Sequence, residues 1–419
     1  MIISRTKKHI IVFLLVINML FSTGMSFAYW ASSLSGNQNT GDGELTLGDW
    51  YDGIPIFTTE EFINVITTPN NTNTYVLARD LDFQNITPPE WTQTKDIIFQ
   101  GSLDGNDKTI SNVSLTDYRG IFGILDGATI RNLTLDGVNI NYTLTDNYTV
   151  GILAGRMQGT GNVIENIRIR NSSVTNTILS GGVIGFASPA SGTGTATMSN
   201  IKVQNTSITG AFANAAYGTG GIIGTVNAFN ISLSDIYVEA TITSNAISSV
   251  GGIIGASLAG STISVTRAVV FANSRFRAWS SDANVFVGGV IGRNQGSISI
   301  SDFMLTGQLD GFVTNPNNNN YTMRAGVTVG VGNAPTTQTN VRSSQITLYR
   351  RANNPAVLIN SQTLYEKMTG QKPAYSTTVY IQSRSTTMTN AWWTTNYSAI
   401  TSSSLWSYNA TTRLYELNN

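Results

Sequence analysis

Carboxylates are the residues of this chain that could do acid–base chemistry, because other common catalytic groups are scarce. The sequence contains no cysteine and one histidine, His9. Ser-His-Asp and Cys-His catalysis both need a histidine, and zinc sites usually use histidine or cysteine ligands. The glycines also lack the following Lys-Ser/Thr of a nucleotide-binding loop. These chemistries are therefore not expected after the first residues of the chain.

The candidate carboxylates are Asp80 with Asp82, and Asp104 with Asp107 in the following turn. Hydrolysis of a glycosidic bond needs two carboxylates about 5 to 10 Å apart, one of them with a raised pKa. The sequence does not show such a pair, and a turn or ladder role is the alternative for all four residues. No cofactor is expected. Calcium is an open alternative, with possible oxygen ligands at Asp42, Glu44, Asp49 and Asp52, although EF-hand spacing is missing.

A Gly-x-x-Gly segment is repeated along the chain after these residues. Its copies are Gly120-Ile121-Phe122-Gly123, Gly182-Val183-Ile184-Gly185, Gly221-Ile222-Ile223-Gly224, Gly252-Ile253-Ile254-Gly255 and Gly289-Val290-Ile291-Gly292. A variant, Gly151-Ile152-Leu153-Ala154, lies between the first two copies. Self-similarity at a fixed period indicates a repeat architecture.

A second pattern follows each copy, with Asn or Asp between alternating apolar residues. Its polar positions are Asn112, Asn132, Asn166, Asn200, Asp235 and Asp302, with Arg267 replacing the Asn in one copy. From Asn132 onward this column advances by 34, 34, 35, 32 and 35 residues. Alternating apolar residues predict short strands with one buried face.

Such strands bury their apolar face only when one repeat stacks on the next, at roughly 4.8 Å per layer. The sequence therefore predicts an all-β, single-stranded parallel β-helix, or β-solenoid, over residues 54–345. The Asn column is expected at a corner, where its amides bond from layer to layer. The glycines are expected to provide positive φ or close backbone approach. Ile130, Ile164, Met198 and Leu233 should then form a single file.

Both ends of the solenoid look capped. Residues 58–67 predict a short amphipathic helix with Thr59 as its cap and Phe62, Ile63 and Ile66 facing the first coil. A second short helix is expected at 361–368. The C-terminal segment, 346–419, is rich in aromatic residues, which are expected to cover the last rung. Aromatic rings that stack on sugars are the alternative.

A regular threonine face of the kind that binds ice is not expected. The outward positions of the second strand are mixed and charged, from Thr134 and Arg168 to Lys202 and Tyr237. The pairs Thr143/Thr145 and Thr241/Thr243 look isolated. The mixed face suits weak contacts with a protein or a glycan.

Residues 1–28 have the features of a secretory signal. Three basic residues precede the largely apolar run 10–21, and Ser26-Phe27-Ala28 gives a small-x-small site with cleavage after Ala28. This run is too short to span a bilayer unless cleavage fails. Residues 29–53 are expected to form a short strand and a linker. The remaining chain has a net charge of about −3 from 24 bases, less three, and 24 acids, which argues against a nucleic-acid partner.

The repeats resemble the GLUG-motif repeats of bacterial surface and secreted proteins. The resemblance rests on the Gly-x-x-Gly strand, the following Ile-x-Asn-Leu-x-Leu, and the lead-in segments 58–62, 75–83 and 99–105. It implies a solenoid but not an activity. Separately, Ala28-Tyr29-Trp30-Ala31 and the residues up to Gly36 resemble the start of proteins with a SipW-type signal, the group of TasA and camelysin. That resemblance implies export in a Gram-positive bacterium.

These observations predict a secreted, cell-surface-associated protein that is not an enzyme. Its expected role is adhesion or structural spacing in an extracellular matrix, through an extracellular protein or glycan partner. No nucleic acid and no membrane span after signal cleavage are expected. The alternative is a β-helix polysaccharide lyase or glycoside hydrolase that uses Asp carboxylates.

Overall fold

The computed structural model describes residues 51–84, 96–143, 149–176, 179–210, 216–244, 249–271, 275–280, 285–313, 323–333, 335–351, 378–381 and 388–418. The signal 1–28 with its cleavage site at Ala28, most of the segment 29–53, the helix expected at 361–368 and three of the four possible calcium ligands lie outside these residues. Within the described residues, no helix is both long and apolar enough to cross a membrane.

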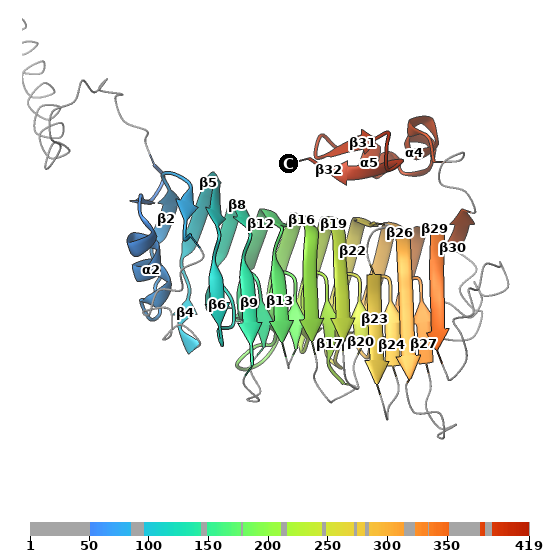
Figure 1. The fold of residues 1–419 in the computed structure, drawn as a ribbon, viewed down its shortest axis with the longest axis horizontal. Helices are drawn as coiled ribbons and strands as arrows, with labels where there is room; N and C mark the ends of the chain where they lie inside the picture. Colours follow the sequence, from blue (N-terminus) through green and yellow to red (C-terminus); the bar gives the residue numbers. More distant parts are fainter. Residues whose placement is uncertain are drawn as a thin grey trace, which may run out of the picture. The chain divides into compact units, whose positions relative to one another are not determined.

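Successive rungs contribute strands to three parallel sheets, and Figure 1 shows the rungs side by side along one axis. The large sheet contains β1 (Ile54–Ile56), β2 (Thr74–Leu77), β3 (Leu81–Asp82), β5 (Ser102–Ser111), β6 (Ser114–Thr116), β8 (Thr129–Asp136), β9 (Asn139–Tyr142), β12 (Asn162–Arg170), β13 (Ser173–Asn176), β16 (Gly194–Gly210), β19 (Phe229–Ser244), β22 (Thr262–Val270), β23 (Arg275–Ser280), β26 (Ser297–Val313), β29 (Thr337–Arg351) and β30 (Thr378–Ile381).

Two further sheets lie beside the large sheet, and the short one begins at β10. The middle sheet contains β4 (Ile98–Phe99), β7 (Phe122–Asp126), β11 (Ala154–Gln158), β15 (Ile184–Ala187), β18 (Ile223–Val226), β21 (Ile254–Ser257), β25 (Ile291–Asn294) and β28 (Val329–Gly332). The short sheet contains β10 (Val150–Gly151), β14 (Ser180–Gly181), β17 (Gly218–Gly220), β20 (Ser249–Gly251), β24 (Val285–Gly288) and β27 (Met323–Gly326). The predicted all-β parallel solenoid is therefore confirmed.

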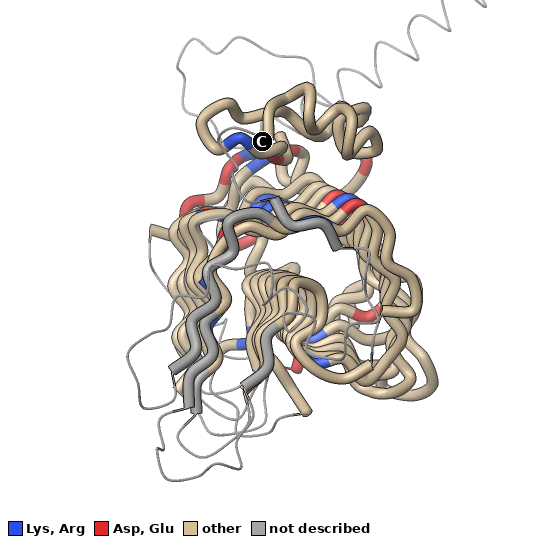
Figure 2. Tube along the Cα trace, turned by 90° about the vertical axis from the view of Figure 1, so that its right-hand side faces the viewer, with Lys and Arg blue, Asp and Glu red and all other residues tan. Residues whose placement is uncertain are grey.

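The core is built from apolar residues that stack in register. Ile130, Ile164 and Met198 pair across β8, β12 and β16, and Leu233 of β19 continues this file. All four side chains are fully buried, which is worth about 1.5–3 kcal/mol for each large apolar side chain. Figure 2 looks along the stack, so that successive rungs lie behind one another. The single file expected from the sequence is confirmed.

The Asn column lies at the first corner of the large sheet. Asn132, Asn166 and Asn200 all adopt left-handed backbone, with φ of 53°, 52° and 52°, a conformation that Asn tolerates better than most residues. Asn166 Nδ2 donates to Asn132 Oδ1 at 2.9 Å, and Asn200 Nδ2 donates to Asn166 Oδ1 at 3.0 Å. These bonds join three successive rungs.

The column changes chemistry further along. Asp235 and Asp302 keep the positive φ, and Arg267 adopts it as well. Arg267 Nη2 pairs with Asp235 Oδ2 at 2.6 Å, so an ion pair replaces the amide bond between these rungs. Asp302 Oδ1 accepts from Asn340 Nδ2 at 2.6 Å.

Asn112 does not belong to this column. Its neighbour Ser111 pairs with Asp136, which places Asn112 beside Gly137 at a second corner. The position opposite Asn132 is taken by Asp107, because Lys108 pairs with Leu133. The cause is a register shift in β5 between Asp104 and Lys108, which moves the sequence motif away from its structural position.

The repeated glycines form two files that allow backbone segments to touch. The first glycine of each motif precedes a middle-sheet strand, and a Cβ at Gly182 or Gly221 would overlap the carbonyl oxygen of the next rung's glycine. The second glycine lies within that strand, where a Cβ at Gly224 would be 2.8 Å from the Ser180 carbonyl oxygen of the short sheet. The first file is Gly120, Gly182, Gly221, Gly252 and Gly289, and the second is Gly123, Gly185, Gly224, Gly255 and Gly292.

The helix α2 (Thr59–Thr67) covers the first rung, as Figure 1 shows. Its N-cap is Thr58, one residue before the predicted cap, and Thr58 and Glu61 form a reciprocal capping box. Phe62, Ile63, Val65 and Ile66 are buried. The apolar side chains of this helix therefore face the core of the solenoid.

The C-terminal segment contains α4 (Asn390–Asn396), α5 (Ser398–Thr401) and an antiparallel hairpin of β31 (Trp406–Asn409) and β32 (Leu414–Leu417). Its aromatic residues, including Trp393 and Trp406, pack with Tyr237, Val269 and Met304, which point outward from the large sheet. The expected aromatic cluster is present, but it covers the side of β19, β22 and β26 instead of the last rung, because those outward positions are apolar.

Hydrogen bonds fix this segment on the solenoid. Trp406 Nε1 donates to the buried Asp235 Oδ1 at 2.8 Å, and Tyr397 Oη donates to the Phe303 carbonyl oxygen at 2.9 Å. Asp235 thereby joins the corner column to the C-terminal hairpin.

Candidate functional site

A second corner divides the large sheet into two arms. Asn171 and Asn205 occupy this corner with φ of 51° and 49°, and Gly137 and Asn112 take the same position on earlier rungs. Asn205 is an extra residue relative to β19, where Gln204 pairs with Glu239 and Thr206 with Ala240. The corner file therefore ends at β19. We call the strand segments before this corner the first arm and those after it the second arm.

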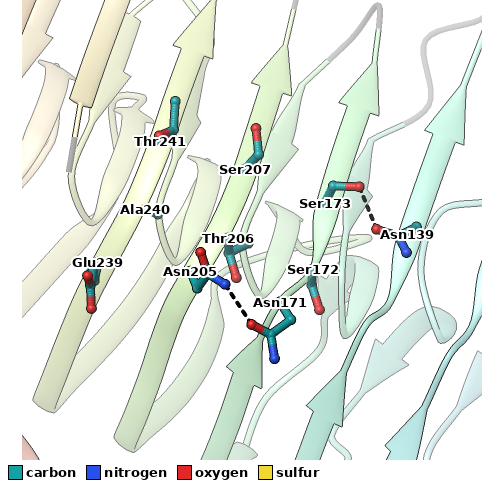
Figure 3. Close-up of a pocket in the computed structure, with 10 residues that line it drawn as sticks. All are labelled: Asn139, Asn171, Ser172, Ser173, Asn205, Thr206, Ser207, Glu239, Ala240 and Thr241. Carbon is teal, nitrogen blue, oxygen red and sulfur yellow. Dashed lines mark hydrogen bonds between the residues drawn. The ribbon is translucent and has the colours of Figure 1, made fainter. Parts of the chain in front are cut away.

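A polar furrow follows the second corner across four rungs, with a volume of about 430 Å³. Figure 3 shows its side chains arising from adjacent strands. Its lining residues are Asn139, Asn171, Ser172, Ser173, Asn205, Thr206, Ser207, Glu239, Ala240 and Thr241. Glu239 is the charged member of this set, and the others are amides, hydroxyls and one alanine.

Hydrogen bonds hold the floor of the furrow in place. The buried Ser172 hydroxyl donates to the Arg170 carbonyl oxygen at 2.7 Å and accepts from the Val138 amide at 3.0 Å. The buried Thr206 hydroxyl donates to the Gln204 carbonyl oxygen at 2.9 Å. Because these groups are satisfied within the sheet, the floor has a fixed shape.

The wall amides are bonded from rung to rung. Asn205 Nδ2 donates to Asn171 Oδ1 at 2.6 Å, and Asn171 Nδ2 donates to Asp136 Oδ1 at 2.9 Å. Ser173 Oγ donates to Asn139 Oδ1 at 2.7 Å. Each amide carries two donors and one acceptor oxygen, so one bond per group does not exhaust its capacity. The furrow can therefore offer both donors and acceptors to a ligand.

The second arm continues the furrow as a flat polar face, which we call the hydroxyl–amide grid. Its side chains alternate with buried residues such as Val174, Ile208 and Ile242. They lie in register over five rungs, in the pairs Ser114/Thr116, Asn139/Asn141, Ser173/Thr175, Ser207/Thr209 and Thr241/Thr243. Thr241 and Thr243, which look isolated in the sequence, are thus part of a regular array. Rungs are roughly 4.8 Å apart, and alternate residues along a strand roughly 6.6 Å apart.

The first arm differs from the grid in both charge and exposure. Thr134, Arg168, Lys202 and Tyr237 are in register there, as the sequence predicted. Arg168 Nε donates to the Asn418 carbonyl oxygen at 3.0 Å, and burial lowers the pKa of Arg168 to about 10. Burial also lowers the pKa of Lys202, which lies 5.7 Å from the Tyr237 ring centroid. This arm is engaged by the C-terminal segment.

The four candidate carboxylates are bound to neighbouring turns and rungs. Asp80 Oδ1 accepts from the Thr109 amide at 2.7 Å, and Asp104 Oδ2 pairs with Arg131 Nε at 2.8 Å. Asp82 Oδ1 accepts from Asn112 Nδ2 at 2.9 Å, and this bond is the main cause of a lowered pKa of Asp82. Asp107 accepts from Asn166 Nδ2 at 3.3 Å. These contacts agree with the turn and ladder alternative.

The sequence reasoning missed the furrow, although a signal for it exists. Asn171 and Asn205 follow the ladder residues Asn166 and Asn200 by five positions, as Gly137 follows Asn132. A recurring Asn or Gly at this offset marks the second corner, because both residues tolerate positive φ.

Comparisons with known proteins relate part of this solenoid to peptidases. Residues 58–171 match the family model described as "M26 IgA1-specific Metallo-endopeptidase N-terminal region". A protein named Halomucin, from Haloquadratum walsbyi (strain DSM 16790 / HBSQ001), is 33% identical over 133 residues, which are 27% of this chain and 1% of Halomucin. The chain therefore spans a very small part of that relative.

One solved structure shows the same fold, and a second is similar only at a low level. A protein from Bacteroides ovatus, assigned as an immunoglobulin A1 protease, superposes with a TM-score of 0.51 and 18% identity, covering 87% of this chain and 91% of that one. A structure named IgA1 Protease gives a TM-score of 0.42 and 14% identity, covering 80% of this chain and 26% of that one. The first likeness supports the β-solenoid fold, and the second is too weak to support an inference.

The family match corrects two expectations. Adhesion or structural spacing without catalysis, with a polysaccharide lyase or hydrolase as its alternative, is contradicted, because the matched region is described as part of a metallo-endopeptidase. The expectation that the chain is not an enzyme is contradicted by the same finding. The resemblances to GLUG repeats and to a SipW-type signal stay predictions.

The described residues do not fit a peptidase metal site. Across the described ranges, groups of three or more His, Cys, Asp or Glu side chains that could hold a metal ion do not occur. The sequence has one histidine, at position 9, and no cysteine. The usual three protein ligands of a catalytic zinc are therefore not assembled by the described solenoid.

Proposed function

We propose that this chain is the substrate-binding solenoid of a metallo-endopeptidase, and that it holds a protein substrate along the polar furrow and the hydroxyl–amide grid. The observation that carries the proposal is the match of residues 58–171 to the N-terminal region of such a peptidase. The matched residues run from the α2 cap to Asn171, so they include part of the furrow wall.

The proposal assigns peptide-bond cleavage to a metal centre outside the described residues, on the same polypeptide or on an associated one. This division agrees with the lack of a fitting ligand set in the described solenoid. It also agrees with the rigid, polar floor of the furrow, which suits binding and orientation of a substrate. Holding the substrate close to the metal centre raises its effective concentration there.

Secretion is part of the proposal. Residues 1–28 carry the charged start, the apolar run and the small-x-small site of a secretory signal, with cleavage after Ala28. Export through a SipW-type route and kinship with GLUG-motif surface proteins would place the chain outside the cell, where a substrate such as an immunoglobulin is available. The matched family model and the Bacteroides ovatus structure are both named for immunoglobulin A1, so immunoglobulin A1 is the first substrate to test.

The test uses the chain together with the proteins that bind to it in its own organism. The full-length protein, carrying an epitope tag, is captured from the culture medium of its own organism and incubated with immunoglobulin A1 and with a panel of other secreted glycoproteins. We expect discrete fragments, identified by mass spectrometry of their new termini. Cleavage should stop on addition of a metal chelator and return with zinc.

Two controls make this test decisive. The same capture from cells that lack the gene should give no cleavage, which ties the activity to this chain. Purified chain should also bind the intact substrate in a biosensor assay. If captured protein neither cleaves nor binds any member of the panel, the proposed function is wrong.

A further inference from the structure

The hydroxyl–amide grid and the furrow beside it form a continuous surface over five rungs whose side chains include no base. The next rung ends this surface, because β23 places Arg275 and Arg277 in register with Thr241 and Thr243. The grid residues are Ser, Thr and Asn on all five rungs. Asn139, Thr175, Ser207 and Thr241 are exposed. Along the furrow, Glu239 adds one carboxylate. A ligand for this surface must therefore recognise neutral donors and acceptors that repeat along the solenoid axis.

We infer that this surface binds an extended neutral glycan, lying along the solenoid axis, and that it recognises the carbohydrate of a glycosylated substrate. The inference rests on the proposed function for its substrate, but the surface itself is defined by the grid. Sugar hydroxyls, like Ser, Thr and Asn side chains, both donate and accept hydrogen bonds. A chain of similar sugar units can repeat its contacts on successive rungs.

The charge of the surface favours a neutral glycan over an anionic polymer as its ligand. Nucleic acids and acidic polysaccharides are held by Lys and Arg, and their binding weakens steeply with salt. The five grid rungs offer neither residue, Arg275 and Arg277 lie beyond them at the β23 end, and Glu239 would repel a polyanion. Binding that depends little on ionic strength is therefore expected.

The pairing of the backbone favours a glycan over an extended peptide as the ligand. Peptides that add as strands need a free sheet edge. In β9, β13, β16 and β19 the backbone is paired with neighbouring strands, as in Ser173 with Asn139 and with Ser207. The furrow thus presents the face of a sheet, where side chains, and not backbone groups, make the contacts.

The test uses two double variants on the same pair of strands. S207E/T241E places charges in the grid, at paired exposed positions of β16 and β19. T197E/S232E places the same charges at paired exposed positions on the first arm of the same strands. Circular dichroism and thermal melting check that both variants fold like the unmodified chain.

Binding is measured by calorimetry with cello-, chito- and manno-oligosaccharides as probes. We expect at least one probe class to bind the unmodified chain, with affinity that is stable to added salt. S207E/T241E should bind at least about tenfold more weakly, a change that corresponds to the loss of one or two hydrogen bonds. T197E/S232E should bind normally. Failure of all three probe classes to bind, or equal losses in both variants, would overturn the inference.

A second part of the experiment distinguishes this inference from the proposed function. Native and enzymatically deglycosylated immunoglobulin A1 are compared as ligands and as cleavage substrates of the captured protein. Weaker binding after deglycosylation supports glycan recognition. Equal binding of both forms, lost in S207E/T241E, indicates peptide recognition and overturns the inference while the proposed function stands. Oligosaccharide binding without any associated cleavage overturns the proposed function and leaves the glycan surface standing.

Discussion

Single asparagines set the corners of this solenoid by combining two properties. They accept a positive φ that most residues avoid, and their amides bond the equivalent amide on the next rung. Asn166 shows both, with φ of 52° and bonds to Asn132 and Asn200. Arg267 shows that the conformation can be kept without the amide, since its guanidinium replaces the ladder bond by an ion pair with Asp235.

The double role of Asn166 can be separated by two substitutions. Asn166→Gly keeps the positive φ accessible but removes both ladder bonds, whereas Asn166→Ala removes the bonds and adds backbone strain. We expect Asn166→Ala to lower the free energy of unfolding by about 2–4 kcal/mol, and Asn166→Gly by about 1–2 kcal/mol. Denaturant unfolding, followed by circular dichroism, measures both.

The order of the two Asn166 variants is the critical result. If the glycine variant is as unstable as the alanine variant, backbone conformation contributes little at this corner. If neither differs from the unmodified chain, the ladder bonds do not stabilise the solenoid.

The Asn column could be predicted from sequence because its repeats have nearly constant length. Asn132, Asn166 and Asn200 are each 34 residues apart, and their alternating apolar neighbours have strong strand patterning. Asn112 was placed wrongly because the register shift in β5 brings it to the other corner. A local motif cannot reveal such a shift, since it depends on which strand lies alongside.

At the scale of strands, the glycine files allow two sheets to lie against each other. The middle and short sheets approach so closely that a Cβ at Gly185 would be 2.6 Å from the Val150 backbone nitrogen. The repeated Gly-x-x-Gly segment thus encodes sheet packing as well as a turn. The spacing recurs along the chain because the second glycine meets short-sheet backbone on successive rungs, as at Gly185, Gly224 and Gly255.

Gly221 tests this packing. A Cβ there would overlap the Gly252 carbonyl oxygen and lie 2.9 Å from Val238 Cγ1, so the rung must shift. We expect Gly221→Ala to lower the free energy of unfolding by more than about 3 kcal/mol, in the range of severe overpacking. Thermal and denaturant unfolding provide the measurement.

Gly192→Ala is the matched control for Gly221→Ala. Gly192 has φ of +66°, and space within 4 Å of its Cβ position is empty. The substitution therefore introduces strain of about 1 kcal/mol without a clash. A Gly221→Ala variant no less stable than the Gly192→Ala variant would show that the sheets can separate at little cost.

The register between strands of successive rungs is difficult to predict from sequence when the connections between them differ in length. Thr241/Thr243 and Ser207/Thr209 lie side by side, but irregular connections separate their rungs in sequence. The grid and the furrow can therefore be identified only from the strand pairing. The sequence also does not indicate where the C-terminal segment packs, because its contacts with Tyr237, Val269 and Met304 join residues more than eighty positions apart.

At the scale of the whole molecule, a solenoid must protect its terminal rungs. An uncovered rung presents unpaired backbone groups and apolar side chains, which favour assembly with a second copy. The helix α2 lies at the N-terminal end, and its Phe62 ring lies 6.3 Å from the Phe83 ring and 6.4 Å from the Phe122 ring. Phe62 is fully buried by these contacts.

Phe62→Asp should detach this cap, because a buried carboxylate without a partner is strongly unfavourable. We expect the variant to form larger species in proportion to protein concentration, detected by size-exclusion chromatography with light scattering. Phe57→Asp is the control, since Phe57 is 41% exposed and lies just before the helix. It should elute like the unmodified chain. If Phe62→Asp loses helix signal but its mass distribution stays the same at every concentration, α2 does not protect the first rung, and the end of the large sheet must resist association by its own shape.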